Sequence, residues 1–315
     1  MPVNKIVTKV DGVINKTINF NDLKAGISLG AHTITAEAWN GATLISTQTK
    51  NITITATTSY EAETTAYMNA IAIPDNSSAS IYTGKTNNDI WVAVDTYIKD
   101  LKSNSLWDKI EALYPIVGDT ANKHSYNLRD SNTYQITWFG SGTHTINGYT
   151  GNGTNGYGNT GFVETRNADN SSFVLLRTSN INSSTVEIGG VTASYSSGSH
   201  IYTKYNNAND IVVRNQNDTF DLLLGTAPNG WMATSRLNNT NYMIQKNDVS
   251  ETFTRAGSSE ICPFEYYVAA RNKGGTAENF SSNESVAYGL GKGLTTAELS
   301  ILRTLTLQLQ INLGR

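Results

Sequence analysis

A glycine-rich run in the middle of the chain has the spacing of a nucleotide-binding motif. Gly151, Gly153 and Gly156 in GNGTNG match G-x-G-x-x-G, which holds a dinucleotide pyrophosphate where it joins a strand to a helix. Here the preceding segment GTHTINGYT is polar and the following segment NTGFVETR has a strand pattern. Because no helix N-terminus is available for the pyrophosphate, we expect a turn between strands, with the glycines at positive φ and the neighbouring asparagines as further turn formers.

Paired carboxylates would indicate a second kind of chemistry, the hydrolysis of glycosidic bonds. A glycoside hydrolase needs an acid and a nucleophile on one strand face, about 5–5.5 Å apart in retaining enzymes. The nearest pair within a strand, Asp218 and Asp221, has an odd spacing and projects to opposite faces. The other candidates are isolated: Glu164, Glu187, Glu251, Glu260 and Glu265. The sequence therefore predicts no catalytic residues of this kind, and Asp221 is interpreted as a turn or strand-edge residue.

Nucleophilic and metal chemistry also lack their usual patterns. The serine motif G-x-S-x-G is absent. The histidines His32, His124, His144 and His200 are scattered, without an H-x-H or H-E-x-x-H arrangement. The single cysteine, Cys262, is interpreted as a small apolar residue at a strand end. We expect neither a triad nor a histidine-based metal site.

Calcium is the one cofactor that the residues leave open. Calcium is bound by carboxylate and amide oxygens in loops, and residues 205–218 supply four candidate ligands: Asn206, Asn207, Asn209 and Asp210. They lack the D-x-D-x-D-G spacing of a dedicated calcium loop. The prediction is therefore a chain without a cofactor, with calcium as the alternative.

Aromatic residues beside polar turns are the candidates for ligand binding. Sugars are held by aromatic faces, with amides, carboxylates and backbone groups binding their hydroxyls. Six aromatic residues lie in or next to turns rich in Asn, Gly and Ser: Tyr149, Tyr157, Tyr202, Tyr205, Trp231 and Tyr242. Packing in the core or across strands is the alternative role for each. Tyr149 and Tyr157 flank the glycine run and are the candidates if that turn binds a ligand.

Composition restricts the partners. Charged residues make up 16% of the chain, and its polar character comes from Asn, Ser, Thr and Gly, as is typical of extracellular β-proteins and virion proteins. The net charge of -3 gives no electrostatic footprint for nucleic acid or an anionic membrane. The first residues, MPVNKIVTKV, contain no signal-peptide core, and no apolar run is long enough to span a bilayer. We expect a protein that leaves its cell by lysis or a leaderless route.

The first 86 residues divide into a β-rich module and a connector. Four segments of residues 1–56 have strand patterns: KIVTKVDGVI, KTINFN, AHTITAEAW and LISTQTKNITIT. They indicate a small immunoglobulin-like (Ig-like) β-sandwich that is short or partial. Residues 57–86 are rich in Ser, Thr and Asn and are interpreted as a connector.

Two helices are expected between residues 87 and 114. Thr86 or Asn87 can cap the first, and its apolar residues fall on one face: Ile90, Val94, Tyr97, Ile98 and Leu101. Ser105 and Asp108 can cap a shorter second helix that contains Ile110 and ends before Pro115.

From residue 124 to residue 290 the sequence is almost entirely β-type. Short apolar segments such as SSFVLLRT, NDIVVRN and FEYYVAAR recur at intervals of about 8–13 residues between turn signals, which predicts an antiparallel sandwich or jelly roll. Without intervening helices a doubly wound parallel sheet is excluded. At the end, Thr295 and Glu298 form a capping box for a helix over about 295–313, whose leucine stripe should pack on the sandwich.

Three segments carry a family resemblance. LWDKIEALYPIVGDTANKHSYNLRD, ITWFGSGTHTINGYTGNGTNGYGNTGF and YYVAARNKGGTAENFSSNESVAYGLGKGLTTAELSILRTLTLQLQINLGR occur in this order and resemble tailed-bacteriophage virion proteins that end in a concanavalin A-like (laminin-G-like) jelly roll. The resemblance covers about residues 87–315. It implies a mainly β fold, with helices before the jelly roll and a closing helix packed on it. The N-terminal module similarly resembles the Ig-like modules of virion surfaces.

What the resemblance implies is a non-enzymatic structural protein on the virion surface, made in the bacterial cytoplasm without a signal peptide. It is expected on a head fibre, tail fibre or decoration protein. The N-terminal module would bind other virion proteins, the chain would form a homo-oligomer, with a trimer as the first expectation, and the jelly roll would adhere weakly and multivalently to host-surface or environmental glycan. The alternatives are a virion-associated polysaccharide depolymerase and a purely architectural protein without a ligand.

Overall fold

The computed structural model describes residues 5–10, 13–15, 30–40, 43–54, 59–166, 171–177, 185–205, 210–216, 219–223, 230–258 and 260–315. The chain divides into two compact units, Met1–Ser59 and Tyr60–Arg315. No helix of the described ranges has the length and apolar character needed to cross a membrane.

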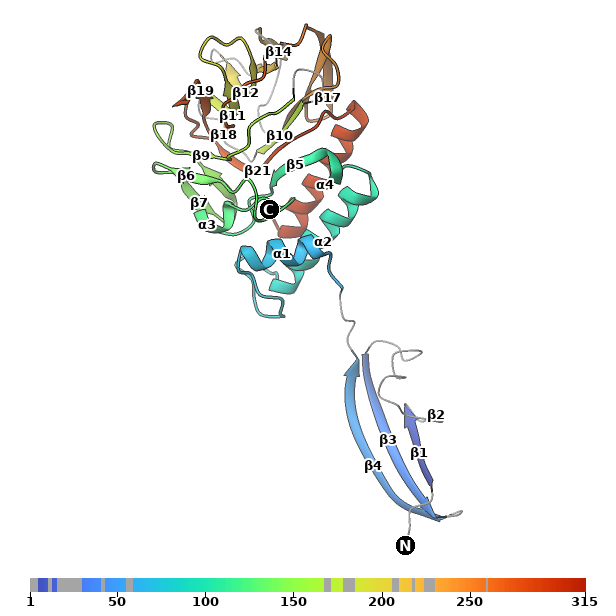
Figure 1. Cartoon of the computed structure of the whole chain (residues 1–315). Coiled ribbons are helices and arrows are strands. Elements are labelled where there is room, and N and C mark those ends of the chain that lie inside the picture. Colours follow the sequence, from blue (N-terminus) through green and yellow to red (C-terminus); the bar gives the residue numbers. More distant parts are fainter. Residues whose placement is uncertain are drawn as a thin grey trace. The chain divides into compact units, whose positions relative to one another are not determined.

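The described strands of the first unit form one antiparallel sheet of order β2-β1-β3-β4 (Figure 1). Their bounds are β1 Lys5–Val10, β2 Val13–Asn15, β3 Gly30–Asn40 and β4 Thr43–Ile54. β3 and β4 pair from Gly30 opposite Ile54 to Asn40 opposite Thr43. The segment KTINFN lies outside the described residues, and within them there is no second sheet of the kind that the expected sandwich needs.

The second unit is a β-sandwich of two sheets, almost entirely antiparallel, with helices packed on one of them (Figure 1). The eight-stranded sheet has the order β17-β16-β15-β10-β21-β8-β7, and β5 also pairs with β21. Its strands are β5 Ile110–Tyr114, β7 Thr143–Thr145, β8 Gly148–Thr150, β10 Ser171–Arg177, β15 Gly230–Arg236, β16 Asn241–Lys246, β17 Val249–Thr254 and β21 Glu284–Gly291.

The nine-stranded sheet has the order β14-β13-β12-β11-β18-β9-β6, with β19 attached to β11 and β20 to β19. Its strands are β6 Thr137–Phe139, β9 Tyr157–Asn159, β11 Thr185–Val191, β12 Gly198–Tyr205, β13 Asp210–Asn215, β14 Asp221–Leu223, β18 Tyr267–Val268, β19 Arg271–Lys273 and β20 Thr276–Glu278. The chain is therefore mainly β, as the sequence predicts.

Two apolar clusters hold the second unit together. One lies between the two sheets and contains residues from both, such as Ile201, Val213, Met232 and Tyr288. The other lies between the eight-stranded sheet and the helices α1 Ala62–Ala70, α2 Asn87–Ser103 and α4 Thr296–Leu313. The eight-stranded sheet thus buries apolar side chains on both of its faces.

The first and last predicted helices of the jelly-roll region are confirmed. Thr86 caps α2 in a capping box with Asp89, and the whole predicted stripe from Ile90 to Leu101 is buried. Thr295 and Glu298 form the capping box of α4, and Gly314 ends it in the left-handed conformation with φ of 83°. Reciprocal hydrogen bonds at the N-cap satisfy backbone N–H groups that the helix leaves free.

The second predicted helix, over 105–114, is wrong. Trp107–Lys109 form one turn of 3-10 helix, and Ile110–Tyr114 continue as strand β5. β5 pairs with β21, with Tyr114 opposite Tyr288 and Ala112 opposite Leu290. Pairing with a strand that lies far along the chain overrides the local helical spacing, because it buries alternate side chains in the two clusters.

The interpretation of residues 57–86 as a connector also needs correction. The chain divides after Ser59, and the following residues fold with the second unit. α1 lies here, and Tyr67, Met68, Ile71 and Tyr82 are buried in the cluster beneath the helices.

Another short helix, α3 Ala121–His124, follows β5.

The glycine run forms the turn between β8 and β9, so a strand and not a helix directly follows it. Asn152 Oδ1 accepts hydrogen bonds from the backbone N–H groups of Thr154, Asn155 and Gly156. Positive φ was expected for all three glycines, but in this run only Gly153 has it, at 73°. Gly151 is needed for a different reason, because a Cβ there would lie 2.0 Å from the carbonyl oxygen of Ser281.

Candidate functional site

The outer face of the nine-stranded sheet carries the candidate site. One row of residues across this sheet faces the other sheet and is buried between them: Val213, Ile201, Ile188 and Val268. Since side chains alternate along a strand, the neighbouring row faces outward. In that row Arg214 pairs with His200, His200 with Gly189, and Gly189 with Tyr267.

A hollow of about 330 Å³ lies on this outer face. Its volume is within the range of small-ligand sites, roughly 300–1,000 Å³. Most of its lining consists of aromatic and cationic side chains from β12, β13, β19 and the turns beside them: Tyr195, His200, Tyr202, Arg214, Phe220 and Arg271. Phe220 is 45% exposed, so this residue of the lining is accessible to solvent.

Tyr195 contacts three cationic side chains at the hollow. Its ring lies 5.2 Å from the Arg214 guanidinium, 5.0 Å from that of Arg271 and 4.3 Å from Lys273 Nζ. Arg214 Nη1 also donates to the carbonyl oxygen of Tyr195, and Arg271 Nη2 donates to its hydroxyl at 2.8 Å. Tyr195 has φ of 61°, an uncommon value for a residue with a side chain.

The described lining of the hollow contains two guanidinium groups and no carboxylate. Arg271 forms an ion pair with Glu278, its cross-strand neighbour on β20. Arg214 and Arg271 are 5% and 7% exposed. Both guanidinium groups are therefore held in place by their neighbours at the wall of the hollow.

His200 lies between these cations on β12. It is 4% exposed, and within the described residues its Nδ1 has no hydrogen-bond partner. Burial, together with the positive charges of Arg271 and Arg214, holds the pKa of His200 well below its ordinary value. The imidazole is neutral at pH 7 and can donate or accept a hydrogen bond.

A second aromatic group lies at the other end of the same face. Phe139 on β6 stacks on Tyr157 of β9 with ring centroids 5.0 Å apart and planes at 14°. Tyr157 also contacts Tyr267 of β18 at 4.8 Å and Phe280 at 5.8 Å. Phe139 is 43% exposed, so this group presents an aromatic edge to solvent.

Two of the six predicted aromatic residues lie on the outer face. Tyr202 lines the hollow, and Tyr157 belongs to the second aromatic group. Tyr205 is the last residue of β12, but its side chain lies outside the described part of the chain. Of the aromatic and cationic residues that line the hollow, four were not predicted from the sequence: Tyr195, Arg214, Phe220 and Arg271. His200 was not assigned a ligand-binding role. The alternation of His200 and Tyr202 against Ile201 on β12 was the available signal.

The other three predicted aromatic residues are buried, so they are not exposed platforms for sugars. Trp231 is fully buried beneath the helices, where its Nε1 donates to Gln245 at 2.8 Å. Tyr149 and Tyr242 are each 1% exposed and lie between the sheets. The Tyr242 hydroxyl donates to Asp221 at 2.8 Å. In each case the strand places the ring on a face that another layer covers.

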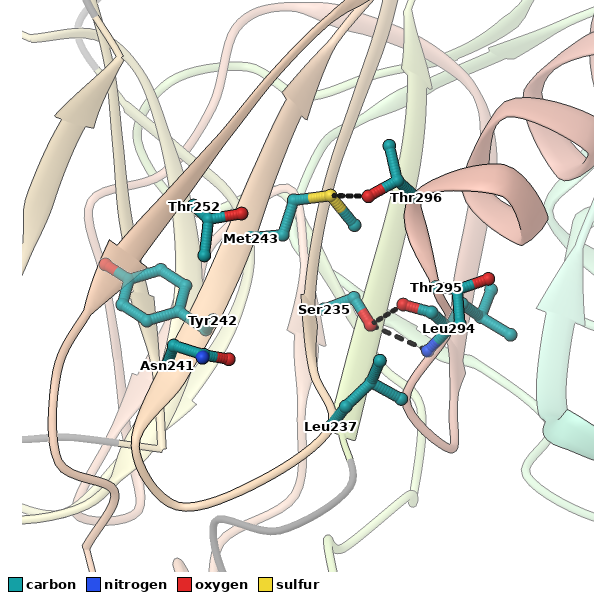
Figure 2. Close-up of a pocket in the computed structure, with 9 residues that line it drawn as sticks. All are labelled: Ser235, Leu237, Asn241, Tyr242, Met243, Thr252, Leu294, Thr295 and Thr296. Carbon is teal, nitrogen blue, oxygen red and sulfur yellow. Dashed lines mark hydrogen bonds between the residues drawn. The ribbon is translucent and has the colours of Figure 1, made fainter.

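Figure 2 shows a smaller hollow, between the strands β15 to β17 and the start of α4. The Ser235 hydroxyl bonds both the N–H and the carbonyl of Leu294 at 2.7 Å, and Thr296 donates to Met243 Sδ at 3.0 Å. The ring of Tyr242 points away from Ser235 in this view. A volume of about 170 Å³ and polar groups that bond one another make this hollow a weaker candidate. A third hollow, between α1 and residues 128–131, has no aromatic residue in its described lining.

The fold brings together two groups of titratable residues that are distant from one another in the sequence. His124 and His144 share a hydrogen bond between their Nδ1 atoms, 2.9 Å apart. Arg166 binds both oxygens of Glu111, at 2.6 and 2.9 Å, and also bonds Glu164. Burial raises the pKa of Glu164. Because Arg166 engages both carboxylates and neither lines the three hollows above, the cluster serves as a structural ion pair.

The calcium candidates receive no support in the described residues. Asn206, Asn207 and Asn209 lie outside them, as does the side chain of Asp210. Across the ranges that the structure covers, no group of three or more His, Cys, Asp or Glu side chains is arranged to hold a metal ion.

No protein-family model and no curated protein sequence matches the chain. Solved structures with distant similarity include the CBM40 domain of the Ruminococcus gnavus IT-sialidase, at 15% identity and a TM-score of 0.34 over 43% of this chain and 83% of that one. The binding domain of botulinum neurotoxin serotype D is similar at 12% identity and a TM-score of 0.42, over 64% of this chain and 52% of that one. Domain 4 of AbnA, a GH43 extracellular arabinanase from Geobacillus stearothermophilus, has 12% identity and a TM-score of 0.42, over 62% of this chain and 98% of that one.

Proposed function

We propose that the chain is a glycan-binding structural protein, displayed on the outside of a tailed bacteriophage particle as a head fibre, tail fibre or decoration protein. The observation that carries the binding role is the hollow on the outer face of the nine-stranded sheet, with aromatic rings and fixed hydrogen-bond donors around one space. The order of the three motif segments supports the place on a virion.

The geometry of the hollow suits weak and reversible binding of sugars. Tyr202 and the exposed ring of Phe220 offer faces for the C–H surface of a sugar, while His200 and the arginines can bond its hydroxyls. Its volume of about 330 Å³ is at the lower end of the range of ligand pockets, so we expect a single copy to bind weakly. A homo-oligomer, with a trimer as our first expectation, gains affinity because linked copies bind as one.

We further propose that the protein does not cleave its ligand. A retaining glycosidase needs two carboxyl groups about 5–5.5 Å apart on either side of the bond. The described lining of the hollow contains no carboxylate, and Glu278 is paired with Arg271. The N-terminal unit is proposed to join the chain to other virion proteins.

A glycan array probed with the purified full-length chain tests this proposal. We expect binding to at least one class of bacterial surface glycan, and a loss of that binding in the variant Phe220→Ser. Val249→Ser is the matched control, because Val249 is 62% exposed on β17 of the other sheet. Release of new reducing ends from the bound glycan by the chain alone would show a depolymerase instead. Absence of binding to every glycan by the oligomer would leave a purely architectural role.

The place on the particle needs a separate measurement. Mass spectrometry of purified particles and electron microscopy with an antibody against the chain would find it at the capsid, collar or tail. Its absence from purified particles would contradict the virion part of the proposal, without affecting the glycan-binding part.

A further inference from the structure

The second aromatic group of the outer face lies in register with the hollow. Tyr267 on β18 belongs to the same row across the nine-stranded sheet as His200 on β12, and Asn159 on β9 is its direct neighbour in that row. Tyr157 precedes Asn159 by two residues and pairs with Phe139 on β6, so these two side chains share the outer face as well. The term Phe139 group is used for the four rings that contact one another here: Phe139, Tyr157, Tyr267 and Phe280.

The segment that follows β20 joins the hollow to the Phe139 group. Asn279 lines the hollow, and the next residue, Phe280, contacts the ring of Tyr157 with centroids 5.8 Å apart. The Cα atoms of consecutive residues are about 3.8 Å apart, so the hollow and the group adjoin at this point. The Asn279 carbonyl oxygen accepts a hydrogen bond of 3.2 Å from the Val186 N–H on β11. This bond ties the segment to the sheet, so the two regions are held in a fixed arrangement.

The Phe139 group and its neighbours have the composition of a sugar site. Phe139 is 43% exposed, and Tyr157 and Phe280 are half-buried. Thr137, which is exposed, pairs with half-buried Asn159 on the same face. Aromatic rings bind the C–H surface of a sugar, and hydroxyl and amide groups can bond its hydroxyls. Rings beside uncharged polar side chains therefore favour a saccharide over an entirely apolar partner.

The distance between the two regions sets the length of the ligand that can use both. β12, β11, β18 and β9 are consecutive neighbours in the sheet (Figure 1). Neighbouring strands are about 4.8 Å apart, so the three steps from β12 to β9 cover about 14 Å. A single sugar ring in the hollow cannot also reach Tyr157 on β9, whereas a linear chain of several sugars can. Once one end of such a chain is bound, the remainder binds at a high effective concentration.

We infer that the hollow and the Phe139 group form one continuous face for a linear oligosaccharide that runs across the strands from β12 to β6. This inference rests on the proposed glycan-binding function and names the form of its ligand, an extended chain of several sugars instead of a single terminal sugar. The hollow binds one part of the chain, and the rings of Phe139 and Tyr157 bind sugars further along it.

The dependence of affinity on ligand length tests the inference by titration calorimetry of the full-length chain. The probes are three neutral linear series, in which a disaccharide is compared with its hexasaccharide: cellobiose with cellohexaose, diacetylchitobiose with chitohexaose, and maltose with maltohexaose. In at least one series we expect the hexasaccharide to bind at least about tenfold more tightly than the disaccharide, a difference of about 1.4 kcal/mol.

Variants of the Phe139 group locate the source of this difference. Phe139→Ser, at an exposed position where folding is not at risk, should weaken binding of the hexasaccharide by about threefold to tenfold, because one stacked ring is lost. Binding of the disaccharide should change by less than about twofold. Tyr157→Leu should have the same effect, and Phe139→Tyr, which keeps a ring, should bind as the original chain does.

A variant in the hollow and a variant remote from both regions complete the design. Phe220→Ser should weaken the disaccharide and the hexasaccharide by a similar factor, because both occupy the hollow. Ile311→Ser is the matched control, because Ile311 is 64% exposed on α4, which packs on the other sheet. It should leave both affinities unchanged.

The outcomes distinguish the inference from the function on which it rests. Equal affinity for disaccharide and hexasaccharide in every series that binds would overturn the inference and leave glycan binding intact. The same holds if Phe139→Ser and Tyr157→Leu both leave hexasaccharide binding unchanged, or if none of the three series binds while the array yields a glycan ligand. If neither these probes nor any glycan of the array binds, the proposed function itself fails.

Discussion

The two sheets of the second unit differ in what covers their outer faces. The eight-stranded sheet packs against the other sheet on one side and against α1, α2 and α4 on the other. The nine-stranded sheet packs on its inner side in the same way, but its outer side carries the hollow with the paired arginines, His200 and exposed Phe220. In the part of the chain that the structure describes, helices pack on the outer side of the eight-stranded sheet (the covered sheet) and none packs on that of the nine-stranded sheet (the uncovered sheet).

This difference explains the fate of the predicted aromatic residues. Trp231 lies on β15 of the eight-stranded sheet and Tyr202 on β12 of the nine-stranded sheet. Both side chains point away from the other sheet of the sandwich. Trp231 is covered by helices, so it has become part of a core, whereas Tyr202 lines an open hollow. On this fold, an outward-facing aromatic residue is available to a ligand only where no helix covers it.

The largest expected effect on the free energy of unfolding comes from a substitution on the eight-stranded sheet, which the helices cover. Trp231→Ala removes a fully buried ring and takes away the Nε1 donor that bonds Gln245 Oε1. We expect the free energy of unfolding to fall by about 3–5 kcal/mol, as is usual when a buried Trp is truncated. Urea denaturation followed by circular dichroism measures it. A loss below about 1 kcal/mol would show that the helices do not seal this face.

Acid should destabilise the end of the covered sheet. Burial lowers the pKa of His124 to about 3 and that of His144, on β7, to about 4. Since the unfolded chain takes up these protons near pH 6.5 and the folded protein does not, the free energy of unfolding should fall as the pH drops from about 6.5 toward 4. A fully buried histidine contributes a slope of at most about 1.4 kcal/mol per pH unit, and half-buried His144 contributes less.

The variant His144→Gln sharpens this measurement. It removes one titrating group, so unfolding curves at about pH 7, 5.5 and 4.5 should show a smaller pH slope than in the original chain. His200→Gln is the companion variant on the uncovered sheet. Because burial also holds the pKa of His200 low, this variant should likewise reduce the pH slope of the free energy of unfolding. Equal stability of the original chain at about pH 7 and 4.5 would contradict the prediction.

Local patterns in the sequence predicted the elements whose signals are complete within a few residues. The capping boxes at Thr86 and Thr295 and the stripe of α2 belong to this group. β5 does not, because its strand conformation depends on pairing with β21 more than 170 residues later, between Tyr114 and Tyr288. Its apolar spacing alone is equally consistent with a helix.

The candidate site was predictable only in part, for a similar reason. The polar turns and alternation on β12 indicated Tyr202, but the hollow also needs Tyr195 from a turn and Arg271 from β19. Parallel pairing of β11 with β19 brings Arg271 to this face. No local sequence pattern predicts that pairing. The two arginines that line the hollow are equally impossible to place from a composition with a net charge of -3.

A smaller effect on the free energy of unfolding is expected at the N-terminus of α4, the helix that packs on the eight-stranded sheet. Thr295→Ala removes the side-chain acceptor of the Glu298 N–H and half of the capping box. We expect a loss of about 1 kcal/mol in the free energy of unfolding. Thr304→Ala, at an exposed position inside the same helix, is the control and should change stability by less than about 0.5 kcal/mol. Equal effects of the two variants would mean that the cap does not stabilise the helix.

The smallest effect on stability is expected on the uncovered sheet, at Phe220. The ring is 45% exposed at the hollow, so Phe220→Ser should change the free energy of unfolding by less than about 0.5 kcal/mol while it removes a face on which a sugar can stack. The combination of preserved stability and lost glycan binding is what the comparison of the two sheets requires, because it is the reverse of Trp231→Ala. A loss of several kcal/mol, measured by the same urea denaturation, would show that Phe220 is part of a core and that the outer face is covered after all.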